Sequence, residues 1–247
     1  AEVYEVATFY AHFDVIADGE SPPPPITIRI CDSISCMLKN SNQLLQTLES
    51  KVQKNIRILR APCMGRCDTA PVCEIGHRHV DNATPETIQE VLDQKKFGPE
   101  IPKYQDLTAY LHNGGYEVLK ACINGERVID EVIDELSNSD LKGLGGAGFS
   151  TGKKWSYVRA EAKPRLMAVN ADEGEPGTFK DRYYLETNPH SFLEGMLIGA
   201  WAVEAQTVFI YLRDEYPAAR EILITEIAAL ERAGLAAHTK IQLKRGA

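Results

Sequence analysis

Two close pairs of cysteines constrain the first third of this 247-residue chain more strongly than any other feature. Cys31 and Cys36 follow the alternating stretch ITIRIC, which predicts a strand. Cys63 and Cys67 follow a second predicted strand, IRILR. If the two strands are neighbours in one sheet, both loops leave the sheet at the same edge. The spacing therefore predicts that the four thiols converge there.

A 2Fe–2S cluster needs four cysteine ligands, and we favour it for Cys31, Cys36, Cys63 and Cys67. Zinc is one alternative, but zinc knuckles favour two intervening residues, whereas these pairs have four and three. Four unligated core thiols are a second alternative, because free cysteine is commonly buried. A thioredoxin-like thiol oxidoreductase would need a C-x-x-C motif, which the chain lacks.

The remaining cysteines and a histidine pair have no ligand spacing of their own. Cys73 and Cys122 stand alone, so we expect both to be small buried hydrophobic residues. His77 and His79 alternate on one strand and imitate a metal site. A solvent-facing hairpin is the favoured interpretation, because the nearby cysteines already account for the metal.

Charge and hydropathy exclude several classes of function. The formal net charge is −8, without a run of lysine or arginine, which argues against nucleic acid or an anionic membrane as the main partner. No apolar run reaches the ~18–20 residues of a transmembrane helix. The first residues, AEVYEVATFY, have neither the basic nor the apolar region of a signal peptide. We therefore expect a cytoplasmic protein in which clustered cysteines bind metal rather than form disulfides.

The order of predicted elements divides the chain into two α/β parts. Strands at 26–31 and 56–60, helices at 40–53 and 84–95 and two short strands between 72 and 81 predict a small α/β sandwich. The segment 95–104 has the composition of a linker, and helices are expected at 105–112, 115–122 and 128–137. Strands at 165–170, 207–212 and 240–244 then alternate with helices at 189–205 and 217–233, which predicts a parallel, helix-covered sheet. We expect domain boundaries at 1–96, 97–140 and 141–247.

The glycine loop GLGGAGFSTGKKW contains the G-x-G-x-x-G spacing at Gly143, Gly145 and Gly148. A Rossmann turn needs a strand directly before the loop, whereas VIDEVIDELSNSDLK has a helical apolar stripe. Asp172 and Glu173 follow a predicted strand at about the distance of a ribose-binding acid, so the Rossmann alternative is the weaker one but stays open. A purely structural glycine turn is the other alternative.

A second loop, NADEGEPGTFKDR, lies at the carboxyl end of a predicted strand, where α/β sheets bind ligands. Its four acidic side chains are Asp172, Glu173, Glu175 and Asp181. Carboxylates accept hydrogen bonds from sugar or ribityl hydroxyls, and Asn170 can both donate and accept. Lys153 and Lys154, in the glycine loop, offer the positive charge that a phosphate requires.

Together, the cysteine spacing and the two loops resemble the NADH-dehydrogenase flavoprotein module of respiratory complex I, NAD-reducing hydrogenases and NAD-dependent formate dehydrogenases. The chain is similar to their fused diaphorase subunits, in which a thioredoxin-like 2Fe–2S domain precedes the flavin domain. The stretch that begins PRLMAVNADEGEPGTFKDRYYLETNPH is most similar to the beta subunit of molybdenum- or tungsten-containing formate dehydrogenase. The resemblance implies a thioredoxin-like 2Fe–2S domain followed by an incomplete α/β FMN/NAD-binding domain.

The resemblance also implies site residues. The positions that match the family's FMN contacts are Gly143, Gly145, Lys154, Asn170, Asp172 and Glu173. The positions that match its NAD contacts are Phe149, Lys154, Tyr157 and Glu175. Phe149 would stack on the adenine and Glu175 would accept hydrogen bonds from ribose hydroxyls, and no catalytic side chain is implied. The chain departs from the family's SGLRGRGGAGFPTG at Lys142, Leu144 and Ser150.

The implied function is hydride transfer between NAD(H) and FMN, followed by transfer of single electrons to iron–sulfur clusters. The implied partners are a molybdenum or tungsten formate dehydrogenase alpha subunit, or a hydrogenase, and a small 2Fe–2S subunit. In the family, further flavin contacts and the cysteines of a 4Fe–4S cluster follow, so we expect a piece of a longer subunit. A nickel–iron hydrogenase diaphorase and a complex I flavoprotein are the alternatives. A non-catalytic, cluster-bearing docking module is the alternative of another class.

Overall fold

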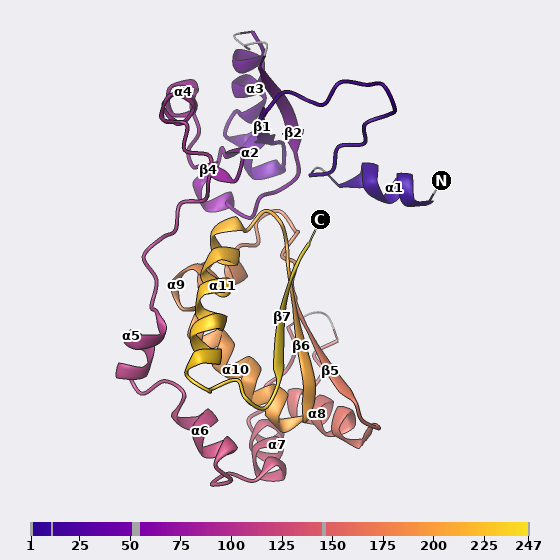
Figure 1. The fold of residues 1–247 in the computed structure, drawn as a ribbon, viewed down its shortest axis with the longest axis vertical. Helices are drawn as coiled ribbons and strands as arrows, with labels where there is room; N and C mark the ends of the chain where they lie inside the picture. The colour runs from indigo at the N-terminus through magenta and orange to yellow at the C-terminus, as the bar shows by residue number, and fades with distance from the viewer. Residues whose placement is uncertain (1, 11, 51–54, 145–146, 247) are drawn as a thin grey trace.

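The computed structural model describes residues 2–10, 12–50, 55–144 and 147–246, which form two α/β domains joined by a helical segment (Figure 1). The amino-terminal helix α1 (Glu2–Phe9) lies beside the first domain. No helix in the described ranges is both long and apolar enough to cross a membrane.

The first domain is a four-stranded mixed sheet with helices packed on it. Its elements are β1 (Ile26–Cys31), α2 (Ile34–Leu38), α3 (Ser41–Glu49), β2 (Ile56–Ala61), β3 (Cys73–Ile75), β4 (Arg78–Val80) and α4 (Pro85–Gln94). The strand order is β2-β1-β3-β4, with β1 and β2 parallel. Cys31 pairs in register with Ala61, so both strands end at the same edge. The predicted adjacency of the two strands is confirmed.

Local sequence fixes helix α4. The Thr84 side chain accepts a hydrogen bond from the Thr87 amide at 3.3 Å, and the Thr87 hydroxyl accepts one from the Thr84 amide. Pro85 occupies the first turn, where no amide donor is needed, and Lys95 ends the helix in the left-handed conformation. Ile88 and Val91 then pack into the core of the first domain.

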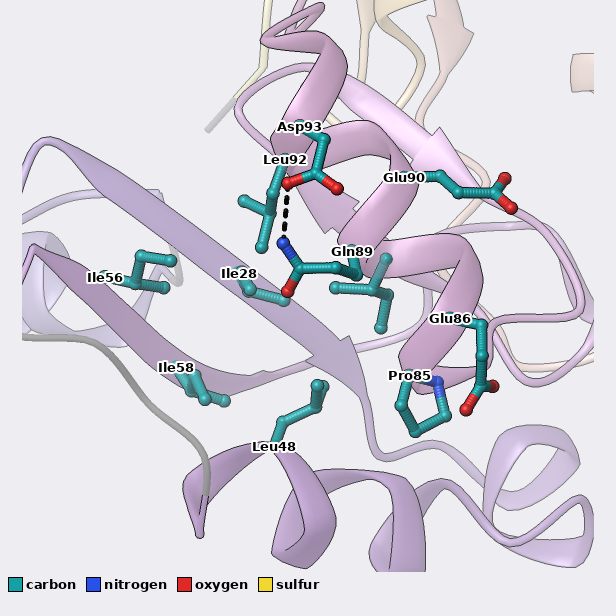
Figure 2. Close-up of a pocket in the computed structure, with 11 residues that line it drawn as sticks. Ile28, Leu48, Ile56, Ile58, Pro85, Glu86, Gln89, Glu90, Leu92 and Asp93 are labelled. Carbon is teal, nitrogen blue, oxygen red and sulfur yellow. Dashed lines mark hydrogen bonds between the residues drawn. The ribbon is translucent and has the colours of Figure 1, made fainter.

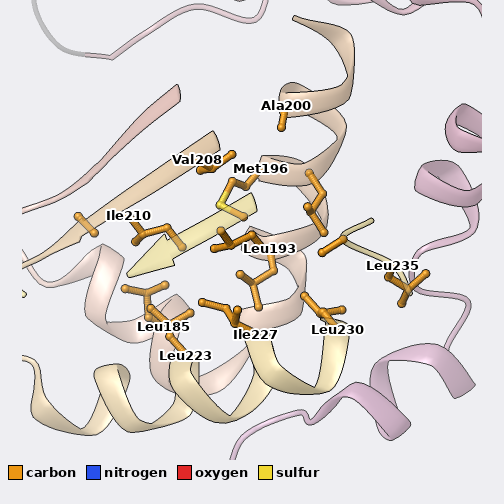
Figure 3. Close-up of a cluster of buried hydrophobic side chains, with 14 of the residues drawn as sticks. Leu185, Leu193, Met196, Ala200, Val208, Ile210, Leu223, Ile227, Leu230 and Leu235 are labelled. Atoms are coloured by element: carbon orange, nitrogen blue, oxygen red, sulfur yellow. The ribbon is translucent and has the colours of Figure 1, made fainter. Parts of the chain in front are cut away.

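The second domain is a three-stranded sheet with all strands parallel, in the order β5-β6-β7. Its elements are α8 (Thr151–Ala160), β5 (Arg165–Ala171), α9 (Lys180–Thr187), α10 (Pro189–Ala202), β6 (Ala205–Leu212), α11 (Pro217–Arg232) and β7 (Lys240–Arg245). Figure 3 shows side chains of α10 and α11, among them Leu193 and Leu223, packed against Val208 and Ile210 of β6. The predicted parallel sheet covered by helices is therefore confirmed.

Three helices lead into the second domain: α5 (Leu107–His112), α6 (Glu117–Ile123) and α7 (Ile129–Asn138). All three lie within two residues of their predicted positions. The structure adds α2, α8 and α9, which the sequence did not predict, and α10 ends at Ala202 rather than at 205 because β6 begins there. Helix α8 packs closely on α7, since a Cβ atom at Gly152 would lie 2.2 Å from Ser137 Oγ.

A buried hydrogen-bond network attaches this helical segment to the second domain. His190 is completely buried, with Nε2 2.8 Å from Glu226 Oε2 and Nδ1 2.8 Å from the Tyr116 hydroxyl. Tyr104 donates to the other oxygen of the Glu226 carboxylate at 2.8 Å. Each polar group in this network has a partner, which avoids the free-energy cost of an unpaired buried polar atom.

Burial of three histidines predicts an acid-sensitive fold. Desolvation lowers the pKa of His79 to about 3 and lowers the pKa values of His190 and His238 below the ordinary 6.5. Below about pH 6.5 the unfolded chain therefore binds protons that the folded chain does not. We expect the free energy of unfolding to fall by up to about 1.4 kcal/mol per pH unit for each histidine. Urea unfolding at about pH 7.5 and about pH 5.5 measures this, and equal midpoints would contradict it.

Candidate functional site

The four paired cysteines converge at the common edge of β1 and β2. Cys63 Sγ lies 3.4 Å from Cys67 Sγ, and the Gly65 amide donates to Cys63 Sγ at 3.4 Å. The Cys31 thiol contacts the thiols of both Cys36 and Cys63. The four sulfur atoms thus form a continuous series of contacts, Cys36 to Cys31 to Cys63 to Cys67.

The electrostatics of these thiols favour a bound cation. The hydrogen bond to Cys31 and desolvation raise the pKa of Cys63, and desolvation raises that of Cys67. The Cys31 thiol donates to Cys36 and lowers the pKa of Cys36. Placing several thiolates together is costly unless a metal compensates their charge.

The donor set fits a 2Fe–2S cluster, which is held by four cysteine thiolates. The residues present therefore fit that group, and the individual ligand assignments remain predictions.

The other cysteines and the histidine pair give a mixed result. Cys73 is 0% and Cys122 1% exposed, which confirms that both are buried hydrophobic residues. The prediction of a solvent-facing hairpin is wrong for His79, because its Nε2 atom is buried and has no hydrogen-bond partner. His79 also lines a cavity of about 520 Å³ together with Pro99 of the linker and Arg182 of the second domain.

The glycine loop follows helix α7 rather than a strand, as the sequence predicted, so the Rossmann context is absent. The Gly143 amide donates to the Phe149 carbonyl at 3.0 Å, which closes the loop, while Gly145 lies outside the described residues. Gly143, Phe149 and Lys154 line a cavity of about 790 Å³ with residues of β5 and α10. Phe149 and Tyr157 are both largely exposed, with ring centroids 6.1 Å apart.

Asn170 and Asp172 lie where β5 ends. The Asn170 side-chain oxygen accepts the Asp172 amide at 2.9 Å, and both Asp172 and Glu175 are exposed. Asn170 lines a second cavity, of about 260 Å³. This cavity shares Val169 and Phe192 with the larger one, so the two hollows adjoin along β5. The cavity beside the glycine loop and the cavity beside Asn170 and Asp181 therefore share a wall.

Glu173 differs from its neighbours because its carboxylate faces the protein. It is 4% exposed and accepts from the Asp181 amide at 3.1 Å and from the Arg182 amide at 3.3 Å. The Tyr216 hydroxyl donates to it at 2.9 Å. The negative carboxylate therefore stabilises the positive amino-terminal end of α9. Because the side chain is already occupied, a contact between Glu173 and flavin would be made by the Glu173 main chain.

The acidic loop and the residues after it contact the cysteine loop of the first domain. The Gly177 amide donates to Cys67 Sγ at 3.2 Å. Arg182 Nε donates to the Gly65 carbonyl at 2.8 Å, and Arg213 donates to the Cys63 carbonyl. Neither arginine was among the predicted site residues, and no local pattern could have identified them, because both partners lie in the other domain.

A separate groove lies in the first domain, away from these residues. Figure 2 shows Ile28, Ile56, Ile58 and Leu48 on its floor and residues of α4 on its rim, where the Gln89 amide donates to Asp93 at 2.8 Å. None of the predicted site residues lines this groove.

Comparison with known proteins gives two family matches. Residues 1–96 match the thioredoxin-like 2Fe–2S ferredoxin family, and residues 136–247 match the Nuo51 FMN-binding domain. The family descriptions name FMN and a 2Fe–2S cluster, which are the cofactors that the sequence predicted.

Individual relatives agree with the family matches. An NADH-quinone oxidoreductase subunit of Rhizobium meliloti (strain 1021) is 43% identical over 140 residues, which are 56% of this chain and 31% of that protein. An NADH-quinone oxidoreductase subunit of Aquifex aeolicus (strain VF5) is 43% identical over 133 residues, which are 54% of this chain and 31% of that protein. The matched segments thus span about a third of each of these relatives.

A solved structure matches the chain from end to end. An NAD+-reducing NiFe hydrogenase in the air-oxidized state superposes with a TM-score of 0.76 and 27% identity, covering 100% of this chain and 46% of that one. An NAD+-reducing NiFe hydrogenase in the H2-reduced state gives a TM-score of 0.77. The order of the two domains is therefore shared with a chain of that hydrogenase.

Proposed function

Since this chain joins a thioredoxin-like 2Fe–2S ferredoxin domain to a Nuo51 FMN-binding domain, we propose that it is the electron-transfer module of an NAD(H)-dependent oxidoreductase. It would exchange hydride between NAD(H) and FMN and exchange single electrons with iron–sulfur clusters. The hydrogen bond from the Gly177 amide to Cys67 Sγ carries this proposal, because it joins the predicted nucleotide loop to a predicted cluster ligand. Nicotinamide and flavin supply the hydride chemistry when they are bound.

The chain's own residues would bind and orient the cofactors. Lys154 would provide positive charge for a phosphate, while Asn170 and Asp172 would accept from hydroxyls at the end of β5. Phe149, at the mouth of the larger cavity, would stack on the adenine. The four cysteines would hold the cluster against the acidic loop, in a site with little room for water.

For the complete enzyme, we propose a cytoplasmic, NAD-dependent formate dehydrogenase in which this chain belongs to the beta subunit. The partners would be a molybdenum or tungsten alpha subunit and a small 2Fe–2S subunit. The stretch 164–201 supports this proposal by its similarity to such beta subunits. A hydrogenase diaphorase is the second candidate, favoured by the end-to-end structural match to the NAD+-reducing hydrogenase. Metal analysis of the co-purified large subunit separates them, because molybdenum or tungsten supports the first and nickel the second.

A cluster-bearing docking module without catalysis is the alternative of another class. It predicts iron and sulfide in the purified native protein without extractable flavin. The electron-transfer proposal predicts both, together with loss of flavin absorbance when NADH is added.

We expect Glu175→Gln to weaken NADH binding about tenfold or more while leaving FMN content unchanged. The Glu175 side chain is exposed at the acidic loop, where its carboxylate can accept charge-assisted hydrogen bonds from a ribose diol. Such interactions contribute about 1.5–3 kcal/mol, and each ~1.4 kcal/mol is tenfold in affinity. Titration of the variant with NADH, with flavin extracted from the same sample, measures both quantities. Equal loss of FMN would place Glu175 in the flavin site instead.

A further inference from the structure

We propose that Arg182 and Arg213 of the second domain are positioning residues that raise the reduction potential of the cluster in the first domain. This inference rests on the proposed cluster at the four cysteines. It means that contacts from the second domain set the reduction potential of a 2Fe–2S cluster whose four predicted cysteine ligands all lie in the first domain.

Arg182 holds the middle of the cysteine loop. Its side chain is 9% exposed, and Nε donates to the Gly65 carbonyl at 2.8 Å. The two terminal nitrogens are held by carboxylates, Nη2 by Asp68 at 2.8 Å and Nη1 by Glu186 at 3.1 Å. All three nitrogens therefore have partners, which fixes the plane of the guanidinium.

Arg213 holds the beginning of the same loop. Its side chain is 5% exposed and donates to the Cys63 carbonyl and to the Glu173 carbonyl. Nε is anchored by the Glu215 carboxylate at 3.0 Å. One side chain thus connects a predicted cluster ligand to the acidic loop.

Together the arginines turn carbonyl oxygens of the cysteine loop towards the second domain. The held carbonyls belong to the peptides on either side of the Met64–Gly65 peptide, so the two arginines fix the orientation of the peptide that carries the Gly65 N–H group. Between the two held carbonyls, the Gly65 amide donates to Cys63 Sγ, and the Gly177 amide donates to Cys67 Sγ. One-electron reduction makes a cluster more negative. Hydrogen bonds to its sulfurs stabilise the reduced form.

Net charge is a smaller contribution than peptide orientation. The positive charge of Arg182 is balanced by Asp68 and Glu186, and that of Arg213 by Glu215. Lysine would keep the charge but could not make the three directed donations of a guanidinium. The inference therefore predicts that Arg182→Lys also lowers the reduction potential. If Arg182 acted only through its positive charge, Arg182→Lys would leave the potential unchanged.

The test is a redox titration of the cluster by dithionite with mediators, followed by the EPR signal of the reduced cluster. We expect Arg182→Met and Arg182→Lys to lower the equilibrium constant for reduction about tenfold, which is about 59 mV for one electron. Arg127→Met is the matched control, since Arg127 lies between α6 and α7 and pairs with Glu135 on the surface. Its potential should equal that of the unmodified protein. Iron content and thermal unfolding are recorded for every variant.

Each outcome decides a separate point. An unchanged potential in both Arg182 variants, with iron retained, would overturn the inference. If Arg182→Met loses its iron, the potential of Arg182→Lys tests the inference. If both Arg182 variants lose their iron, the potential of Arg213→Lys tests it. Absence of a 2Fe–2S signal from the unmodified protein would instead overturn the proposed function.

Discussion

Replacing Cys36 by serine is expected to remove the iron–sulfur absorbance and most of the bound iron. Cys36 is 2% exposed, and the hydrogen bond from the Cys31 thiol lowers the pKa of Cys36, which favours the thiolate form that binds metal. A serine hydroxyl ionises far less readily and is a poor iron ligand. Cys67→Ser should have the same effect. Iron and acid-labile sulfide, measured per chain, give the result directly.

Cys73→Ser is the matched control for this prediction. Cys73 is 0% exposed but lies outside the series of sulfur contacts. Its serine variant should keep the iron while losing about 1–3 kcal/mol of stability, because a buried hydroxyl would lack a partner. Cys122→Ser should likewise keep the iron. Unchanged iron in Cys67→Ser would refute the assignment of Cys67 as a ligand. Loss of iron in Cys73→Ser without unfolding would instead assign Cys73 as a ligand.

The second large effect is expected from Gly65→Ala, which should separate the domains at the cysteine loop. A Cβ atom at Gly65 would lie 2.2 Å from the Tyr216 hydroxyl oxygen, and the backbone has φ +64°. The left-handed conformation costs about 1–2 kcal/mol for alanine, and overpacking costs about 1–3 kcal/mol more. Displacing Tyr216 would also break its hydrogen bond to Glu173. We expect a loss of about 2–5 kcal/mol in the free energy of unfolding, and easier loss of iron.

Gly234→Ala separates the two causes. Gly234 has φ +71°, but no atom lies within 4 Å of an added Cβ. This variant should show only the conformational cost and keep its iron. The difference between the two variants, measured by chemical unfolding, is the contribution of the domain contact. Equal destabilisation would show that Tyr216 moves aside freely.

The parts of the fold that were predicted well depend on local patterns. The alternation in ITIRIC identifies strand β1, and the Thr84 cap identifies the start of helix α4. The pairing of neighbouring strands β1 and β2 then brings Cys31 and Cys63 together. Helices α8 and α9 were missed because polar residues dominate both and neither has a regular apolar stripe, and each is stabilised by packing and end contacts. Gly152 packs on α7 from within α8, and Glu173 caps α9.

The contacts between the domains could not be predicted in this way. Arg182 donates to the Gly65 carbonyl, which lies 117 residues earlier in the chain and in the other domain. Arg213 and Cys63 are 150 residues apart, so no spacing rule relates them. Contacts of this kind follow from how the two domains pack, which neither domain's own sequence pattern determines.

The central claim is that one chain brings a 2Fe–2S cluster and a flavin site together for exchange of electrons with NAD(H). The most direct test is an anaerobic NADH titration of the protein purified from its own cells, with iron, sulfide and extracted FMN counted in the same sample. The account predicts two iron and two sulfide atoms per cluster at the four cysteines, bound FMN, and loss of flavin absorbance upon addition of NADH. Zinc in place of iron, or flavin that NADH does not reduce, would contradict it.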